Sequence, residues 1–400
     1  MRADNSARPL DGIRVIELGQ LLAGPFTGTI LGYFGAEVIK VEPPGAGDPI
    51  RGWRIVEDGT AYWYRSLGRN KKSITLDLKS ERGRELAREL LKTADVAVEN
   101  FRPGTLEKWG LGPEQLHEYN PGLIYARISG YGQTGPYSHK PGYASVTEGF
   151  SGFRYINGFP GQPPVRPNLS VGDTLAAIHA ALGVCLALLH RNRSGKEAGQ
   201  VVDIALYESM YNLMEGVVPE FSGAGAIRGA SGTTLTGIVP TNTYTCADGK
   251  YVVIGGNGDS IYKRLMRAAG HPQMADDPAL AHNEGRVRHE VEIDRVLAEW
   301  CARHPARHIV DILEQEQVPV GLIYNVEDQM EDPHYHARGM FEEVMVNGKS
   351  LTIPAITPLL HDTPGRTDWP GLEPGSHNRE ILGGILGLSD EEIAALNPSG

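Results

Sequence analysis

Short β-rich segments alternate with helical segments along the first half of this 400-residue chain, and this alternation constrains its fold more than any other feature. Strands are predicted at residues 13–18, 37–42, 95–99, 123–129 and 200–206, and helices at residues 26–34, 79–93 and 175–189. Strands that are separated by helices form βαβ units, so the pattern predicts a mostly parallel sheet. Such a sheet binds ligands at the carboxyl ends of its strands.

The pattern changes after residue 221. Residues 222–237 are small and polar, which is typical of a linker or a flap. A second, smaller α/β domain is indicated by predicted strands at 242–245 and 251–254 and predicted helices at 261–269, 287–303 and 306–315. Residues 341–353 predict a β-hairpin around Asn347-Gly348, and residues 390–396 predict a short final helix.

Composition argues against several classes of protein. The net charge is −11, whereas nucleic-acid binding driven by overall charge needs a basic surface. The three cysteines, Cys185, Cys246 and Cys301, form no Cys-x-x-Cys pair, so neither a disulfide framework nor a structural zinc site is indicated. Residues 1–6 are polar and no apolar signal segment follows them, and the apolar stretch 175–189 is shorter than the roughly 20 residues of a membrane span. We therefore expect a soluble, cytoplasmic protein with no membrane or nucleic-acid partner.

A dinucleotide site is the first alternative to consider. The turn Gly19–Pro25 after the first predicted strand lacks the G-x-G-x-x-G spacing, although Glu42 ends the second strand, where a ribose-binding acid would lie. Gly256 and Gly258 are not followed by the third glycine of the dinucleotide-binding motif, so we expect them to form a simple turn. Neither a Gly-x-Ser-x-Gly nor a His-Glu-x-x-His motif is present, and we expect the pair His334 and His336 in a loop rather than at a metal.

Asp173 is the carboxylate that stands out. It follows Gly172 and opens the long apolar helix, where the helix dipole favours its ionised form. An Asp at this place is most often an ordinary N-cap. However, Asp173 also follows a long irregular segment, residues 140–171, of the kind that lines functional sites. An ionised Asp beside a glycine is a candidate nucleophile toward an activated acyl group.

Several motifs, taken in order along nearly the whole chain, resemble the family III CoA-transferases (the CaiB/BaiF group). They are Pro9-Leu10-Asp11-Gly12-Ile13-Arg14-Val15-Ile16-Glu17-Leu18 with Ala23-Gly24-Pro25, then Gly35-Ala36-Glu37-Val38-Ile39-Lys40-Val41-Glu42-Pro43-Pro44-Gly45, Asn70-Lys71-Lys72-Ser73-Ile74-Thr75-Leu76-Asp77-Leu78, Asn100-Phe101-Arg102-Pro103-Gly104, Gly172-Asp173 and Arg338-Gly339-Met340-Phe341.

The resemblance implies an α/β fold with a Rossmann-like large domain and a smaller α/β domain, in a homodimer whose two chains interlink like rings. The large domain is then built from both ends of the chain. We accordingly expect residues 1–221 in the N-terminal part of the large domain, 222–325 in a linker or flap and the small domain, and 326–400 in a return segment that completes the large domain. Coenzyme A and acyl-CoA are implied as substrates, with no permanently bound cofactor and no metal.

The resemblance also implies site residues. Asp173 lies where the family has its catalytic aspartate. The residues at or near positions that hold CoA are Leu22, Ala23, Leu76, Lys79, Asn100, Phe101, Arg102, Lys108 and Lys140. Two residues depart from the pattern of formyl-CoA transferase: Pro43 stands where that enzyme has a basic residue, and Lys108 stands where it has an arginine. The expected substrate residues are Tyr143, Arg166 and Gly237, of which Gly237 belongs to a flap, residues 231–237, that would exclude water.

The expected reaction is transfer of CoA from succinyl-CoA to a dicarboxylate. An arginine near the nucleophile suits a second carboxylate, because a guanidinium binds a carboxylate bidentately. Arg166 precedes Asp173, and Arg51, Arg54 and Arg69 are further candidates. Two alternatives stay open: an acyl-CoA racemase of the same family, whose Gly-His-Asp string is here Gly142-Tyr143-Ala144, and a non-catalytic acyl-CoA-binding protein.

Overall fold

The computed structural model describes residues 7–194 and 197–396; the polar stretch 1–6 lies outside them. Two compact units are present. The first, here called the sheet unit, comprises Met1–Phe153, Pro167–Glu215 and His336–Gly400, and the second, the small unit, comprises Arg154–Arg166 and Gly216–Tyr335. Residues 154–166, 216–221 and 326–335, which we expected in the large domain, therefore group with the small unit.

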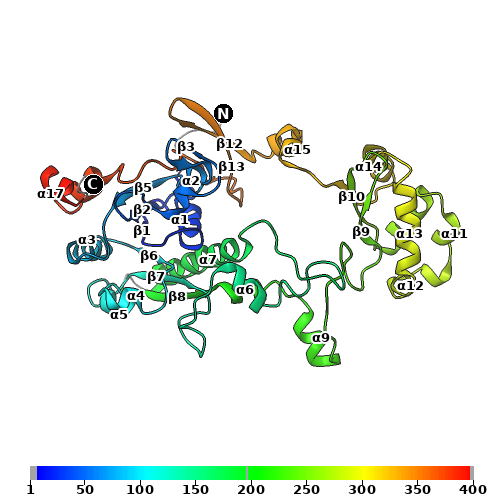
Figure 1. Ribbon diagram of the computed structural model, residues 1–400, viewed down its shortest axis with the longest axis horizontal. Coiled ribbons are helices and arrows are strands. Elements are labelled where there is room, and N and C mark those ends of the chain that lie inside the picture. Colours follow the sequence, from blue (N-terminus) through cyan, green and yellow to red (C-terminus); the bar gives the residue numbers. More distant parts are fainter. Residues whose placement is uncertain (1–6, 195–196, 397–400) are drawn as a thin grey trace. The chain divides into compact units, whose positions relative to one another are not determined.

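A parallel six-stranded sheet forms the centre of the sheet unit (Figure 1). Its strands are β1 (Arg14–Glu17), β2 (Glu37–Glu42), β5 (Lys71–Thr75), β6 (Val96–Glu99), β7 (Ile124–Ser129) and β8 (Gln200–Ala205). Their order, β5-β2-β1-β6-β7-β8, is that of a Rossmann-type sheet, in which the chain builds outward from β1 first on one side and then on the other. The predicted parallel α/β fold is confirmed.

Helices cover both faces of this sheet because successive strand residues point to opposite sides. Val15 packs in a buried cluster with α1 (Ala23–Tyr33) and α7 (Val171–Ser194), whereas its neighbour Ile16 packs in a cluster with α3 (Glu81–Lys92). Both strand residues are fully buried. Apolar packing on both faces explains why pairs such as Val15 and Ile16, or Val38 and Ile39, are adjacent in the sequence instead of alternating with polar residues.

Short elements complete the sheet unit. They are η1 (Pro49–Gly52), β3 (Val56–Glu57), β4 (Thr60–Ala61), α2 (Tyr62–Leu67), α4 (Thr105–Lys108), α5 (Pro113–His117), α6 (Ala144–Phe150), α8 (Leu206–Tyr211), β12 (Phe341–Val346), β13 (Lys349–Pro354), η3 (Arg379–Gly383) and α17 (Asp390–Ala395). The predicted hairpin is confirmed, since β12 and β13 pair antiparallel and both turn residues, Asn347 and Gly348, have positive φ.

The small unit has its own core around a three-stranded antiparallel sheet, β11-β10-β9. Its elements are α9 (Val217–Ala224), β9 (Thr241–Thr245), β10 (Tyr251–Gly255), α10 (Asp259–Ala268), α11 (Pro272–Ala275), η2 (Pro278–Leu280), α12 (Asn283–Arg288), α13 (Glu290–Cys301), α14 (Ala306–Gln315), β11 (Val320–Leu322) and α15 (Val326–Glu331), and α16 (Pro333–Ala337) follows. The prediction of a single helix at 287–303 is wrong, because the helical conformation is interrupted at His289, which separates α12 from α13.

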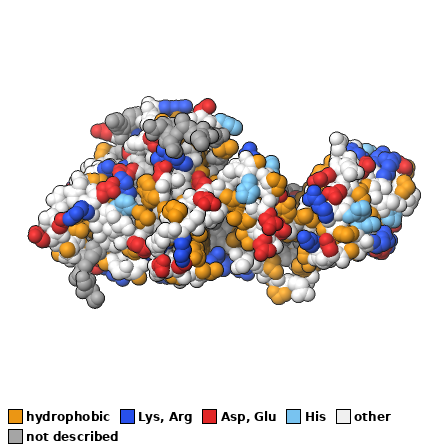
Figure 2. Space-filling model, turned by 90° about the horizontal axis from the view of Figure 1, so that it is seen from above, with side chains coloured by type: hydrophobic (Ala, Val, Ile, Leu, Met, Phe, Trp, Pro, Cys, Tyr) orange, Lys and Arg blue, Asp and Glu red, His pale blue; other side chains and the backbone are white. Residues whose placement is uncertain are grey.

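Helix α7 is longer than the sequence pattern predicts, with 24 residues from Val171 to Ser194. By length and composition it could cross a membrane, with a mean hydropathy of 1.7 over its most apolar window. Within the sheet unit it packs against α1, β7 and β8, as the core helix of an α/β domain does. On the face of the molecule shown in Figure 2, acidic and basic side chains are interspersed with apolar ones.

Candidate active site

The candidate site lies at the carboxyl edge of the parallel sheet. At the centre of the order, β1 and β6 are neighbours, and the segments that leave them run to opposite sides. Such a switch in strand order opens a crevice in which ligands bind. Leu22 and Ala23 follow β1 and begin α1, and Asn100, Phe101 and Arg102 follow β6. The structure thus places these five predicted CoA residues at the switch point.

Asp173 is the third residue of α7 and not its N-cap, because the helix begins at Val171, four residues before the start predicted from the sequence. Its side chain is half-buried, and the preceding Gly172 is buried. A Cβ atom on Gly172 would lie 3.2 Å from Cβ of Ala144 in α6. The amide of Gly172 also donates to Oε1 of the fully buried Glu148, at 3.5 Å. Close packing of α6 therefore fixes the first turn of α7.

The loop after β7 brings two further predicted residues to the same edge. Gly130 and Gly142 are so close that a Cβ on Gly130 would lie 2.7 Å from the carbonyl oxygen of Gly142. This contact closes the base of the loop and places Tyr143 at the same edge of the sheet. Tyr143 directly precedes α6, and its side chain is 74% exposed. Within the loop, Nζ of Lys140 lies 3.6 Å from the ring centroid of Tyr137.

The start of α1 and the start of α7 meet in the core beneath the site. Ala23 and Ala176 belong to one small buried cluster, and Oγ1 of Thr27 donates to the carbonyl oxygen of Ala177 at 3.4 Å. Ala176 is one turn from Asp173 on α7. The structure therefore brings the candidate nucleophile together with the predicted CoA residues of α1, across small side chains that allow the helices to approach.

Hydrogen bonds to neighbouring residues fix the segment that follows β6. Asn100 donates from Nδ2 to the carbonyl oxygen of Gln20 and accepts from its amide, both at 2.8 Å, so its side chain joins the two loops of the switch point. The amide of Phe101 donates to Oε2 of Glu99 at 2.8 Å. Burial raises the pKa of Glu99 to about 7, although the guanidinium of Arg127, 2.8 Å away, opposes this shift.

The remaining predicted CoA residues lie along the same edge. Arg127 also forms an ion pair with Glu107 of α4, the helix that ends at the exposed Lys108. Leu76 and Lys79 follow β5, the outermost strand on the other side, where Leu76 is buried and Lys79 is exposed. Two exposed lysines therefore lie at separate points of the edge, a spacing that suits an elongated anionic ligand.

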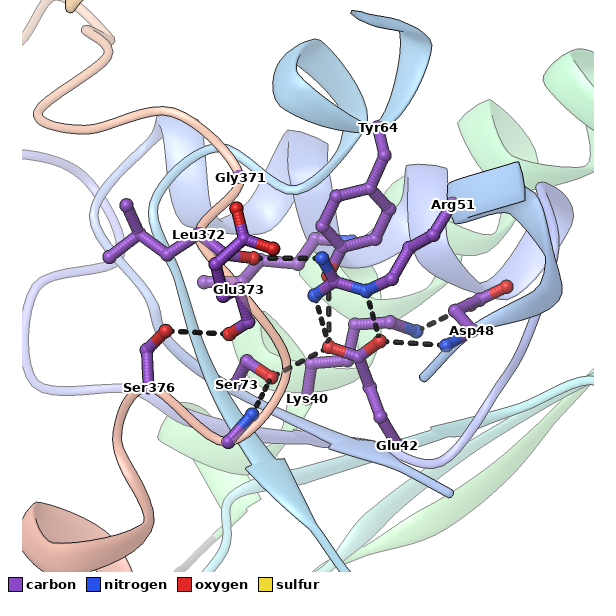
Figure 3. A network of polar contacts seen from close by, with 12 residues as sticks. Lys40, Glu42, Asp48, Arg51, Tyr64, Ser73, Gly371, Leu372, Glu373 and Ser376 are labelled. Carbon is purple, nitrogen blue, oxygen red and sulfur yellow. Dashed lines mark hydrogen bonds and ion pairs between the residues drawn. The ribbon is translucent and has the colours of Figure 1, made fainter. Parts of the chain in front are cut away.

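Glu42 does not have a free carboxylate for a ribose. It is 1% exposed and accepts hydrogen bonds from Arg51 at 2.6 and 2.7 Å, from Ser73 at 2.6 Å and from Tyr64 at 3.1 Å (Figure 3). Burial would raise the pKa of Glu42, but the hydrogen bonds from Arg51 and Ser73 and the charge of Lys40 lower it to about 2. The acid at the end of β2 is thus a structural group, which removes the main support for a dinucleotide site.

Two of the arginines suggested for a substrate carboxylate have internal partners. Arg51 binds Glu42 and the carbonyl oxygen of Leu372, and Nη1 of Arg69 donates to the carbonyl oxygen of Pro354 at 2.6 Å. Both side chains are buried, so the suggestion was wrong for them. The guanidinium of Arg54 stacks on the ring of Trp63, 4.3 Å from its centroid.

The last two predicted substrate residues, Arg166 and Gly237, belong to the small unit. Gly237 has a φ of 78° and its carbonyl oxygen accepts from Asn283 at 2.8 Å. The stretch 222–237, expected as a linker or flap, is not featureless. Its first residues, 222–224, lie in α9, and within the flap Ser231 and Thr234 exchange side-chain to backbone hydrogen bonds of 2.7 and 3.0 Å. Within the described residues, no group of three His, Cys, Asp or Glu side chains is arranged to hold a metal ion.

Sequence reasoning missed Lys40 and Asp48, which lie beneath the switch point. Nζ of Lys40 lies 2.9 Å from Oδ2 of Asp48, and both side chains are fully buried. The available signal was a lysine inside an otherwise buried strand, which requires a buried partner.

Comparison with known proteins supports one family. The family described as CoA-transferase family III matches residues 10–378. A succinyl-CoA–D-citramalate CoA-transferase of Chloroflexus aurantiacus is 47% identical over 400 residues, covering 99% of this chain and 98% of that protein. A succinate–glutarate CoA-transferase of Agrobacterium fabrum is 37% identical, covering 94% and 96%. The crystal structure of a CaiB/BaiF family protein from Brucella suis is 32% identical, with a TM-score of 0.84 and coverage of 95% and 100%.

Proposed function

This chain belongs to CoA-transferase family III, and on that premise we propose that it moves coenzyme A from succinyl-CoA to a dicarboxylic acid, with Asp173 as the nucleophile. The observation that carries the proposal is the position of Asp173 in the first turn of α7, at the sheet edge where the loops after β1, β6 and β7 also end. The positive end of a helix dipole favours the ionised form of a carboxylate in the first turn, and this is the form that acts as a nucleophile.

In the first half-reaction, the Asp173 carboxylate attacks the thioester carbonyl carbon. The C–S bond breaks, CoA thiolate leaves, and an aspartyl–succinyl anhydride forms. The thiolate then attacks the aspartyl carbonyl of this anhydride, and cleavage of the C–O bond releases succinate. The product is an aspartyl-CoA thioester, which retains the energy of the original thioester.

The second half-reaction reverses these steps with a new acid. The acceptor carboxylate attacks the aspartyl thioester, the thiolate leaves, and a mixed anhydride forms. The thiolate attacks the acceptor carbonyl, and cleavage of the C–O bond regenerates the Asp173 carboxylate and releases acceptor-CoA. Both anhydrides must be kept from water, a role that we assign to closure of residues 231–237.

The exposed lysines at the carboxyl edge, Lys79, Lys108 and Lys140, together with Arg102, are our candidates for the phosphates of CoA. The backbones at Leu22, Ala23 and Leu76 are candidates for its uncharged part, because these side chains are buried. Tyr143, Arg166 and Gly237 are proposed to contact the acyl and acceptor groups. All of these assignments are tested by substitution.

The choice of donor and acceptor is supported by the relatives. Their names specify succinyl-CoA with D-citramalate or L-malate, and succinate with glutarate. All these acids carry two carboxylates, and an arginine distinguishes such an acid from a monocarboxylate by a bidentate ion pair. We therefore propose an acceptor of four to six carbons, such as malate, glutarate or a methyl-branched relative like citramalate.

Two alternatives are less well supported. A racemase needs a base on each face of the substrate carbon, and Tyr143 and Ala144 stand where the racemase branch has its His-Asp pair. A non-catalytic acyl-CoA-binding protein would not need a carboxylate in the first turn of α7. CoA binding without exchange against any labelled acid would favour that reading.

We further propose a cytoplasmic homodimer. An apolar stripe of half-exposed residues runs along α7, formed by Ile178, Leu182, Leu186 and Leu189. A stripe of this kind on a soluble protein favours burial against a second copy. Light scattering at several protein concentrations tests this, and a monomer at all of them would contradict it.

The test of the proposed function is an acceptor panel with succinyl-CoA as donor. We expect kcat/KM to be at least about tenfold higher for citramalate, malate or glutarate than for formate, acetate or carnitine, because one carboxylate–guanidinium contact is worth that ratio. The Arg166→Ala variant should lose this preference while retaining CoA binding. A preference for monocarboxylates would contradict the proposal.

A further inference from the structure

The segment between β1 and α1, residues 18–22 (the β1–α1 loop), has an unusual backbone. Leu21 has a φ of 65°, in the left-handed region that a leucine side chain disfavours. A backbone of this kind persists only where the surrounding structure holds it. The loop leads directly into Leu22 and Ala23, the predicted CoA residues at the start of α1.

Side chains from three separate elements bind the backbone of the loop. Lys40 of β2 donates to the carbonyl oxygen of Gly19 at 3.0 Å. Asp48 accepts from the amide of Leu21 at 3.0 and 3.2 Å. Asn100 satisfies both the amide and the carbonyl oxygen of Gln20. Three consecutive residues of the loop are thus fixed by side-chain hydrogen bonds.

Two of these side chains belong to a buried group of paired charges. Nζ of Lys40 lies 3.0 Å from Glu17 and 2.9 Å from Asp48, and all three side chains are fully buried. Nζ of Lys71 lies 2.9 Å from Glu17 and also donates to the carbonyl oxygen of Pro25 in α1. A buried charge that loses its partner is strongly unfavourable, so Lys40 and Asp48 hold each other in place.

The same group is continuous with the network in Figure 3 through the amide of Asp48, which donates to Oε2 of Glu42 at 2.8 Å. The network around Glu42 stabilises a different part of the sheet unit. Ser73 donates to Glu42 at 2.6 Å and accepts from the amide of Gly375 at 3.0 Å, so it binds the C-terminal segment to β5. Within the part of the chain that the structure describes, Ser73 forms no hydrogen bond to the β1–α1 loop, which makes it a matched control.

We propose that Lys40 and Asp48 are positioning residues for the thioester substrate: they hold the β1–α1 loop in its left-handed conformation so that Leu22 and Ala23 meet CoA. This inference rests on the proposed function, which gives Leu22 and Ala23 that role. Neither Lys40 nor Asp48 touches the substrate, since both are buried beneath the loop.

The experiment compares Asp48→Asn with Ser73→Ala. In either orientation, the NH2 group of an asparagine would face a donor, Nζ of Lys40 or the amide of Leu21, so one of the contacts that hold the loop is lost. We expect KM for succinyl-CoA to rise at least about tenfold, with a smaller change in kcat. Backbone hydrogen exchange of the peptide containing residues 18–26 should become faster. Ser73→Ala should lower stability but leave both quantities at their wild-type values.

A second variant avoids disturbing buried charge. In Gly19→Ala, the new Cβ would lie 2.7 Å from Oδ1 of Asn100 and displace that side chain from Gln20. Faster exchange of residues 18–26 is expected here too, so the test of the loop stands even where Asp48→Asn does not fold. Exchange is the readout for this variant, because Asn100 is itself a predicted CoA residue and its displacement would change KM directly.

Three outcomes would overturn the proposal: unchanged exchange in a folded Asp48→Asn or Gly19→Ala variant, equal changes in Ser73→Ala, or faster exchange with unchanged KM. If the wild-type protein transfers no CoA from succinyl-CoA, the proposed function fails separately. In that case the dissociation constant of CoA, measured by calorimetry, replaces KM as the readout.

Discussion

The carboxylate of Glu17 occupies the space in which residue 28 would otherwise carry a side chain. A Cβ atom on Gly28 of α1 would lie only 1.9 Å from Oε2 of Glu17. Glu17 cannot move aside easily, because it is fully buried between Lys40 and Lys71. A glycine at this position therefore allows α1 to pack over the charged group that lies beneath the candidate site.

We expect Gly28→Ala to lower the free energy of unfolding by about 3 kcal/mol, the upper range for overpacking a core. The matched control is Gly149→Ala in α6, where a Cβ would have no neighbour within 4 Å. Alanine should there stabilise the helix by up to about 1 kcal/mol. Urea unfolding of both variants measures the change in the free energy of unfolding. Equal changes in the two variants would show that Glu17 can move away from a Cβ at residue 28 without destabilising the protein.

Stability should fall in acid through Glu42. Its pKa is lowered from 4.5 to about 2 in the folded protein. Its contribution is therefore fully present above pH 4.5 and is lost as the pH falls toward 2, amounting to about 3 kcal/mol. Removing one donor in Ser73→Ala should make this slope shallower, whereas the exposed substitution Glu85→Gln should leave it unchanged. Unfolding measured at a series of pH values decides, and identical slopes in wild type and Ser73→Ala would count against this role of Glu42.

Lys140 should contribute to binding of the CoA donor. Loss of one exposed ionic contact is worth about 1 kcal/mol, so we expect Lys140→Ala to raise KM for succinyl-CoA about fivefold and to leave KM for the acceptor unchanged. Lys92 is a matched control, because its Nζ also lies over a tyrosine ring, 5.0 Å from the centroid of Tyr119. A similar rise in Lys92→Ala, or none in Lys140→Ala, would remove Lys140 from the CoA site.

Much of the fold could be predicted from the sequence because most strands of the sheet carry adjacent buried apolar residues, such as Val15 with Ile16 and Val38 with Ile39. Strand β5 was missed because it begins with Lys71 and Lys72, which read as a polar segment, although Lys71 is buried against Glu17. Helix α6 was missed because its seven residues carry little apolar periodicity and include Gly149. A short or charged element becomes regular only through tertiary contacts, which one sequence does not display.

The candidate site could be predicted in part. Asp173 was identifiable from its glycine neighbour and the helix that follows, and its role stays a prediction. The burial of Arg51 and Arg69 could not be predicted, since an arginine that binds a substrate and one that binds Glu42 or Pro354 look alike in sequence. The partnership of Lys40 with Asp48 likewise depends on where the segment after β2 returns to the sheet.

Covalent trapping at Asp173 tests the proposed mechanism most directly. The protein is incubated with succinyl-CoA, treated with hydroxylamine and digested, and the peptide that contains residue 173 is analysed by mass spectrometry. Hydroxylamine displaces CoA thiolate from the aspartyl-CoA thioester and so converts the side chain to an aspartyl hydroxamate. Attack on the anhydride marks Asp173 only at its aspartyl carbonyl, because attack at the succinyl carbonyl releases succinyl hydroxamate and restores the carboxylate. The control variant Asp390→Asn alters another acid in a helix's first turn, at α17, and should keep both the modification and full transfer activity. We predict hydroxamate at Asp173 only when donor is present, and loss of transfer in Asp173→Ala; transfer that persists in Asp173→Ala, or turnover without modification at residue 173, would contradict the account.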